Sequence, residues 1–153
     1  MSTGPHVYVD ADACPVKAEV AKVAERHGLA VTYVANAWLP IPHGRAFRVQ
    51  VVPGAFDAAD DWIAERAEAG DIVITADIPL ASRALKKGAR VLGPSGKPFT
   101  GDNIGNAMAT RELMADLRAY GVGGGPPPFG PKDRSRFLGA LELAVRQAKQ
   151  SRA

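Results

Sequence analysis

The sequence predicts an α/β fold in which helices flank a central, mainly parallel sheet of four to five strands. Short apolar runs typical of buried strands occupy residues 6–10, 30–35, 47–52, 71–75 and 90–92. Amphipathic helical patterns separate these runs at residues 15–27, 55–69 and 77–87. Strands that alternate with helices are joined by right-handed crossovers, and such crossovers connect parallel strands.

Local chemistry indicates where individual helices begin. Pro15 suits the first turn of the first helix, because the N–H that proline lacks would be unpaired there. A loop rich in glycine and proline covers residues 93–101 and precedes a helix predicted over 103–119. Asp102 or Asn103 would cap the first turn of that helix.

The C-terminal part of the chain differs from the strand–helix alternation before it. Residues 121–131 form a Gly/Pro linker, and residues 132–150 are predicted to form one helix. Phe137 and Leu141 lie on its apolar stripe, which should dock on the core or on a second copy of the chain. At 153 residues, the whole chain 1–153 is predicted to be one domain.

The composition excludes several classes of protein. With 46% apolar and 23% charged residues, the chain resembles an ordinary globular protein, and its apolar runs are too short to cross a bilayer. The N-terminus has no signal-peptide pattern, so a cytoplasmic location is expected. A single cysteine cannot form an internal disulfide or a thiolate zinc site. The net charge of +3 permits an anionic partner without requiring one.

Two carboxylates follow the first predicted strand directly. Asp10 and Asp12 come at its end, just before the helix that Pro15 begins. In open α/β sheets, ligands bind in the crevice at the carboxyl ends of the strands. Carboxylate oxygens suit a hard cation such as Mg²⁺ or Mn²⁺ better than zinc.

A third carboxylate occupies an unusual position on the second helix. With successive side chains 100° apart, Phe56, Ala59, Ile63 and Ala67 form the apolar stripe, and Asp60 falls inside it. An ion on such a stripe is destabilising by several kcal/mol unless it is paired or binds a metal. Asp60 is therefore either a metal ligand, half of a buried salt bridge, or a residue at the edge of the stripe.

A fourth carboxylate, Asp77, follows the fourth predicted strand. Capping of the next helix would by itself explain an aspartate here. If the first and fourth strands are neighbours, however, Asp77 emerges beside Asp10 and Asp12, and Asp60 approaches from the preceding helix. Clustered carboxylates repel one another unless a cation compensates them. The reaction that such a bound cation implies is the in-line hydrolysis of a phosphodiester.

Other functions remain open on the same residues. An aspartyl-phosphate phosphatase would use Asp10 as the nucleophile and Asp12 as the acid/base, although such enzymes usually carry further acids where Asp77 stands alone. A binding module could hold a nucleic acid or a nucleotide in the same acidic pocket without cleaving it. Cys14, at a helix start, is interpreted as a small packing residue because no phosphate-loop arginine follows it.

Four segments, 9–15, 54–60, 71–81 and 132–134, carry a resemblance to a known family, together with Arg111 and Phe137. Through them the chain resembles the YaiI/YqxD family of uncharacterised bacterial proteins, which looks like a branch of the PIN-like nuclease superfamily. PIN-like proteins have three layers, with a parallel sheet between helices, and use clustered acids to bind Mg²⁺ or Mn²⁺ and cleave nucleic acid.

The resemblance implies specific roles for residues of this chain. Asp10, Asp12, Asp60 and Asp77 would be catalytic metal ligands, and Asp57 would hold these ligands in place. The sequence lacks another acid shortly after Asp77, a gap that Asp102 would fill.

The expected activity is metal-dependent hydrolysis of RNA rather than DNA. The arginines that would contact phosphates are Arg45, Arg48, Arg83, Arg111 and Arg134. The basic segment 132–136 is either a lid that closes over a bound phosphate or the basic start of a docking helix.

Overall fold

The computed structural model describes residues 4–12, 14–54, 57–106, 109 and 129–152. Its strands are β1 (Val7–Asp10), β2 (Val31–Ala35), β3 (Phe47–Val51), β4 (Ile72–Ile74), β5 (Arg90–Leu92) and β6 (Pro98–Phe99). Its helices are α1 (Lys17–His27), α2 (Ala58–Arg66), α3 (Ile78–Lys86) and α5 (Pro131–Arg152). The predicted α/β class and C-terminal helix are confirmed. The predicted Gly/Pro linker 121–131 lies mostly outside the described residues.

The strands form one sheet in the order β3-β2-β1-β4-β5-β6. The pairs from β3 to β5 are all parallel, and β6 is antiparallel to β5. The expected neighbourhood of the first and fourth strands is confirmed by the β1–β4 pair. The sequence predicted four to five strands and missed β6, because a two-residue strand that begins with a proline has no recognisable alternation.

The helix predicted over 103–119 begins earlier than expected. Residues 101–106 are helical, and Thr100 caps them. Its Oγ1 accepts a hydrogen bond from the N–H of Asn103 at 3.2 Å, while Oδ1 of Asn103 accepts one from the N–H of Thr100 at 2.9 Å. This reciprocal pair is a capping box, so the proposed capping by Asp102 or Asn103 is corrected to Thr100.

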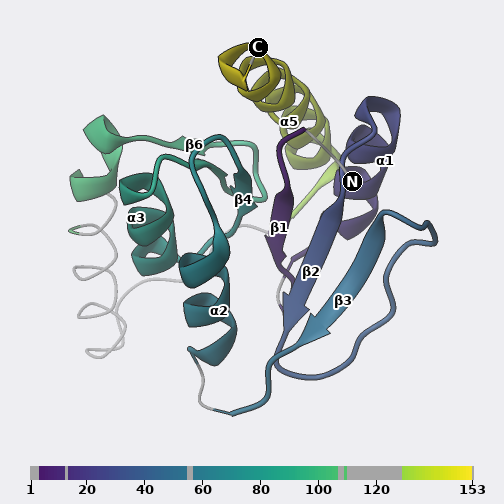
Figure 1. Cartoon of the computed structure of the whole chain (residues 1–153). Coiled ribbons are helices and arrows are strands. Elements are labelled where there is room, and N and C mark those ends of the chain that lie inside the picture. The colour runs from purple at the N-terminus through teal and green to yellow at the C-terminus, as the bar shows by residue number, and fades with distance from the viewer. Residues whose placement is uncertain (1–3, 13, 55–56, 107–108, 110–128, 153) are drawn as a thin grey trace.

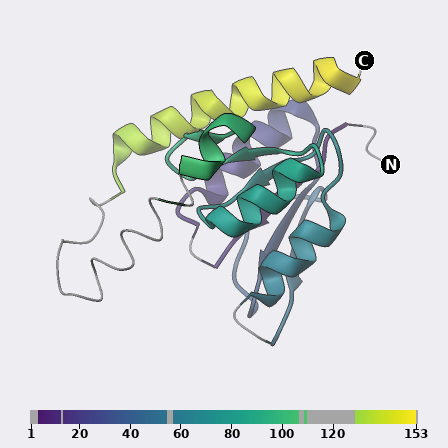
Figure 2. The same ribbon diagram turned by 90° about the vertical axis from the view of Figure 1, so that its left-hand side faces the viewer.

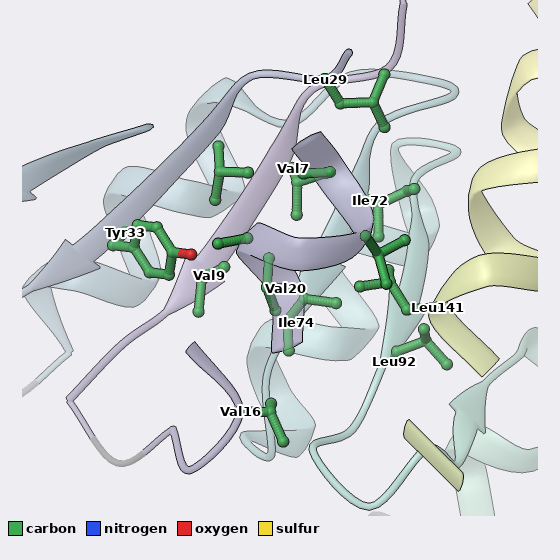
Figure 3. Close-up of a cluster of buried hydrophobic side chains, with 14 of the residues drawn as sticks. Val7, Val9, Val16, Val20, Leu29, Tyr33, Ile72, Ile74, Leu92 and Leu141 are labelled. Atoms are coloured by element: carbon green, nitrogen blue, oxygen red, sulfur yellow. The ribbon is translucent and has the colours of Figure 1, made fainter. Parts of the chain in front are cut away.

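Helices cover both faces of the sheet, which gives three layers (Figures 1 and 2). On one face α1 and α5 pack over a core that includes Val7, Val9, Ile74 and Leu141 (Figure 3). On the other face α2 and α3 cover a second core with different members of the same strands. The alternation of side chains along β1 turns Val7 and Val9 toward α1, so Asp10 faces the α2 and α3 side.

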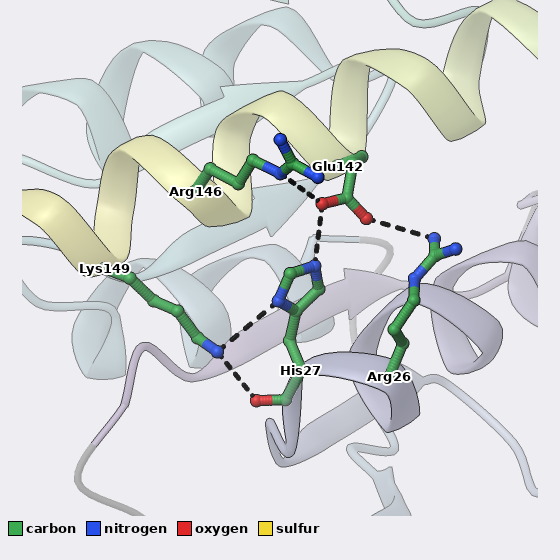
Figure 4. Close-up of polar contacts among 5 residues, drawn as sticks. All are labelled: Arg26, His27, Glu142, Arg146 and Lys149. Carbon is green, nitrogen blue, oxygen red and sulfur yellow. Dashed lines mark hydrogen bonds and ion pairs between the residues drawn. The ribbon is translucent and has the colours of Figure 1, made fainter.

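Helix α5 is an integral part of the first core. Phe137, Leu141, Val145 and Ala148 are fully or almost fully buried, which confirms the predicted docking of the apolar stripe. The helix lies beside α1, and a polar cluster ties the two together (Figures 1 and 4). In that cluster Glu142 lies 2.9 Å from Nε2 of His27 and also contacts Arg26 and Arg146, while Lys149 donates to the His27 carbonyl at 2.9 Å.

This cluster predicts how the stability of the α1–α5 contact depends on pH. Hydrogen bonds from His27 and Arg146 lower the pKa of Glu142 from 4.5 to about 2. A carboxyl group whose pKa is lowered by folding stabilises the fold at pH values above its pKa in the unfolded chain. This contribution is lost as the pH falls from about 4.5 to about 2. We expect Glu142→Gln to lower the melting temperature at neutral pH. On acidification, the melting temperature of this variant should fall less steeply than that of the unmodified protein. Parallel melting curves of the two proteins down to low pH would contradict this assignment.

The loop between β5 and β6 approaches the first turns of α5 closely. Gly96 has a φ of +89°, and a Cβ there would lie 2.8 Å from the carbonyl oxygen of Arg136. Gly96→Ala should therefore lower the free energy of unfolding by about 1–3 kcal/mol in a denaturant titration. Gly101→Ala is the matched control, since a Cβ at Gly101 meets nothing within 4 Å and its stability should hardly change.

Candidate functional site

The carboxyl edge of the sheet carries Asp10 at the end of β1. Its Oδ2 accepts a hydrogen bond of 2.8 Å from the hydroxyl of Thr75, a buried residue that directly follows β4. Burial raises the pKa of Asp10, the Thr75 bond lowers it, and the charges of Asp77 and Asp12 raise it further. Asp10 is thus held in place next to two like charges.

Asp77 has two roles at this edge. Its Oδ1 accepts from the N–H of Leu80 at 2.8 Å, so the predicted capping of the following helix, α3, is confirmed. Its own N–H donates to Oγ1 of Thr75 at 2.9 Å. Since the same Thr75 hydroxyl donates to Asp10, one threonine fixes the ends of β1 and of the β4–α3 turn relative to each other.

Asp60 approaches from the first turn of α2 and is half-buried. Its pKa is raised from 3.8 to about 7, first by burial, then by the charges of Asp10 and Asp77, and then by a side-chain hydrogen bond with Asp77. A hydrogen bond between two carboxyl groups requires a proton on one of them, and the raised pKa of Asp60 favours its protonated form. The structure therefore brings Asp60, Asp77 and Asp10 together, as the sequence predicted.

Asp12 lies at the exposed rim of this cluster. Its carboxylate accepts the N–H of Asn36, at 3.0 Å to Oδ2 and 3.2 Å to Oδ1, and its charge acts on Asp10. The side-chain Oδ1 of Asn36 is buried and has no hydrogen-bond partner among the described residues. A buried carbonyl oxygen without a donor is unusual, and such an oxygen is a ligand that hard cations accept.

The donor set fits a hard divalent cation in its chemistry. The oxygens come from carboxylates, and Asn36, whose N–H binds Asp12, also carries a buried amide oxygen. Among the described residues, no basic side chain is one of the groups that most affect the pKa values of Asp10 and Asp60. Within the described residues, no three acidic, histidine or cysteine side chains are already spaced as the ligands of one ion. A cation would have to draw the carboxylates closer together and compete with the proton, which Asp60 binds more tightly than a free carboxyl group does.

The two supporting acids lie in different places. Asp57 precedes α2, is exposed, and its charge contributes to the raised pKa of Asp60. Asp102 lies on the helical segment 101–106, after β6. Because β6 runs antiparallel to β5, that segment lies toward the opposite edge of the sheet from Asp10 (Figure 1). The expectation that Asp102 completes the ligand set is therefore corrected.

The expected phosphate-binding arginines that the structure describes lie on several different elements. Arg83 pairs with Asp61, and Arg45 is exposed in the loop before β3. Arg48 lies on β3, level in register with Tyr8 and hence two residues before Asp10. Arg111 lies outside the described residues. Arg134 donates to the carbonyl of Pro15 at 2.7 Å and lies 3.3 Å from Glu19, so it fastens α5 to the start of α1.

Cys14 is buried, as the packing interpretation predicted. Burial raises the pKa of its thiol, although a backbone hydrogen bond and Lys17 act in the opposite direction. A raised pKa disfavours the thiolate that a cysteine nucleophile requires.

Sequence reasoning missed two residues of this site. Thr75 and Asn36 each end or follow a predicted strand at the same edge as the aspartates. The available signal was a small polar residue at the last position of an apolar run, which also marks ordinary strand ends. Only the register of β1 with its two neighbours shows which of these residues meet the aspartates.

Comparison with known proteins places this chain in a family. The model of the family described as "Uncharacterized BCR, YaiI/YqxD family" matches residues 8–147. The chain belongs to the YaiI/YqxD family. The match spans β1 to α5 and therefore includes every aspartate of the cluster, which confirms the resemblance stated from the sequence.

Curated relatives of this YaiI/YqxD member cover almost the same length. A UPF0178 protein of Rhodospirillum rubrum is 60% identical over 149 residues, or 95% of this chain and 99% of the relative. UPF0178 proteins of Brucella ovis and Rhodopseudomonas palustris are 59% and 57% identical, over 95% and 96% of this chain and 91% and 90% of their own length. No solved structure gives a significant match. The family is described as uncharacterised, so these matches do not assign a function.

Proposed function

We propose that this protein is a divalent-metal-dependent nuclease that hydrolyses phosphodiester bonds, with RNA as the preferred substrate. The observation that supports this most is the convergence of Asp10, Asp60 and Asp77 from β1, α2 and the β4–α3 turn at one edge of the sheet. Like charges gathered with no basic partner in the described part of the chain favour the binding of a cation. The resemblance to PIN-like proteins points to the same chemistry.

Each residue has a defined part in this proposal. Asp10, Asp60 and Asp77 would hold Mg²⁺ or Mn²⁺, with Asp12 and the Oδ1 of Asn36 as further oxygen donors. When bound there, such an ion would supply Lewis-acid chemistry to a phosphoryl oxygen and to a water molecule. Thr75 keeps Asp10 and the Asp77 backbone at a fixed separation through its two hydrogen bonds. Asp57 adds negative charge beside Asp60 and so favours cation binding there.

Among the described residues, no helix is long and apolar enough to span a membrane. We place the activity in the cytoplasm, where Mg²⁺ and RNA are both abundant.

A cleavage assay tests this function. Purified protein with Mn²⁺ or Mg²⁺ should cleave short single-stranded RNA faster than the same DNA sequence, and EDTA should stop the reaction. The variant Asp10→Asn/Asp77→Asn should be slower by at least about a hundredfold, because ligand loss removes the charge stabilisation of the transition state. Cleavage that survives in this variant would contradict the proposed site.

The same assay decides between the alternatives. Salt-sensitive RNA binding without cleavage would favour a non-catalytic binding module instead. A phosphoaspartate trapped at Asp10 would favour the aspartyl-phosphate phosphatase.

A further inference from the structure

We propose that a basic surface beside the aspartates binds the phosphate backbone of RNA and so sets the side from which substrate enters. We call this surface the basic rim; it consists of Lys17, Lys97, Lys132, Arg134 and Arg136. The inference rests on the proposed function, since it assigns the substrate path of the same site.

Contacts between α1 and the first turn of α5 form the centre of the basic rim. Arg134 donates to the Pro15 carbonyl at 2.7 Å and lies 3.3 Å from Glu19, and its guanidinium lies 5.0 Å from the ring centre of Phe129. The carboxylate of Asp133 accepts the N–H of Gly130 at 2.9 Å and fixes the start of the helix. These contacts make the segment 132–136 part of a docked helix, which favours a fixed binding surface over a lid.

The loop between β5 and β6 brings a further cation to the same place. Gly96 lies so close to α5 that a Cβ would come within 2.8 Å of the Arg136 carbonyl. Lys97 follows Gly96 directly and is exposed. Lys132 is exposed as well, and the Arg136 side chain is 62% exposed. Three positive charges from two segments are therefore accessible to a large anion.

Lys17 connects the basic rim to the aspartates. Its ammonium group donates to the carbonyl of Cys14 at 2.7 Å. The charges of Lys17 and of Asp10 both act on the Cys14 thiol, so the cation and the carboxylate both lie near this residue. A phosphate chain on the rim would thus pass close to the carboxyl end of β1, where Asp10 of the proposed metal site lies.

The charge and polarity of the basic rim favour RNA over a membrane surface. Its five basic side chains form ion pairs with only two acids in the described chain, Glu19 and Asp133. Binding to an anionic bilayer is strengthened by large apolar side chains that enter the lipid. In the part of the chain that the structure describes, the exposed large apolar side chains are Trp38 and Leu143, and neither belongs to the rim.

A binding measurement with matched lysine pairs tests this proposal. The probe is a fluorescent single-stranded RNA of about 20 nucleotides, in EDTA so that metal-dependent cleavage cannot occur. Lys97→Ala/Lys132→Ala should weaken binding about five- to tenfold at roughly 0.1 M salt and reduce the slope of log K against log salt by about 1.4. Lys22→Ala/Lys86→Ala removes two exposed lysines elsewhere and should change affinity less than about twofold.

Three results would overturn the basic rim: unchanged affinity in Lys97→Ala/Lys132→Ala, an equal loss in the control pair, or no RNA binding by the unmodified protein. Loss of binding to vesicles with about 30% phosphatidylserine, with RNA affinity unchanged, would assign the surface to a membrane instead. Rim-dependent RNA binding without metal-dependent cleavage would uphold the rim and contradict the proposed function. Cleavage that requires Asp10 but proceeds normally in Lys97→Ala/Lys132→Ala would support the proposed function and contradict the basic rim.

Discussion

Replacing Asp60 with asparagine is expected to stabilise the metal-free protein at about pH 8, by roughly 1–2 kcal/mol once solvent screening of this half-exposed group is allowed for. The folded pKa of Asp60 is about 7, against 3.8 for the free side chain, chiefly because of burial and then because of Asp10 and Asp77. The folded state therefore binds the proton more tightly than the unfolded state. The free energy of unfolding therefore falls as the pH rises from about 4 to about 7. Above that range the ionised Asp60 destabilises the folded state to its full extent.

Denaturant titrations at about pH 5 and pH 8 measure this effect. The difference between Asp60→Asn and the unmodified protein should be small at the lower pH and largest at the higher pH. Asp61→Asn on the next position of α2 is the matched control, because Asp61 pairs with Arg83 and its loss should not stabilise the fold. A destabilising effect of Asp60→Asn at pH 8 would mean that an unrecognised cationic partner neutralises Asp60.

Truncation of Phe137 should have the largest effect on stability, a loss of about 3–5 kcal/mol for Phe137→Ala. Phe137 is completely buried, and it belongs to the core between α1, α5 and the sheet. The truncation would remove a large apolar surface and leave a cavity under α5. Denaturant unfolding followed by circular dichroism measures the loss.

Leu143→Ala on the same helix is the control for this truncation. The Leu143 side chain is 57% exposed, so its removal should change stability by less than about 1 kcal/mol. Equal effects of the two substitutions would show that α5 contributes little to the core. A small effect of Phe137→Ala would have the same meaning.

The fold could be predicted from the sequence where apolar runs are long and regular. The strands that became β1 to β4 and the helices between them follow the predicted alternation, and the β1–β4 contact follows from it. β6 was missed because it spans only Pro98 and Phe99. The start of the helix at 101–106 was misplaced because several polar residues in that loop are suitable helix caps. In the structure Thr100 and Asn103 cap the helix reciprocally.

The acidic residues of the candidate site could be proposed from the sequence because Asp60 lies on an apolar helix stripe and because Asp10, Asp12 and Asp77 end or follow two strands expected to be neighbours. Asp102 was assigned to the site wrongly, since the antiparallel direction of β6 carries it to the other edge. Thr75 and Asn36 could not be assigned to the site from the sequence. The contact of Thr75 with Asp10 depends on the register of the strands, and the buried Oδ1 of Asn36 is recognised only once its surroundings are known. The basic rim depends on the docking of α5 against α1, which a helical pattern alone does not orient.

Titration of Mn²⁺ into the purified protein, followed by calorimetry or electron paramagnetic resonance, tests the central claim most directly. We predict one saturable site in the unmodified protein and a loss of affinity of at least about tenfold in Asp10→Asn/Asp77→Asn. Glu65→Gln/Glu68→Gln, with two exposed acids removed elsewhere, should bind as the unmodified protein does. The absence of a saturable site, or equal affinity in Asp10→Asn/Asp77→Asn, would contradict the claim that these aspartates bind a divalent cation.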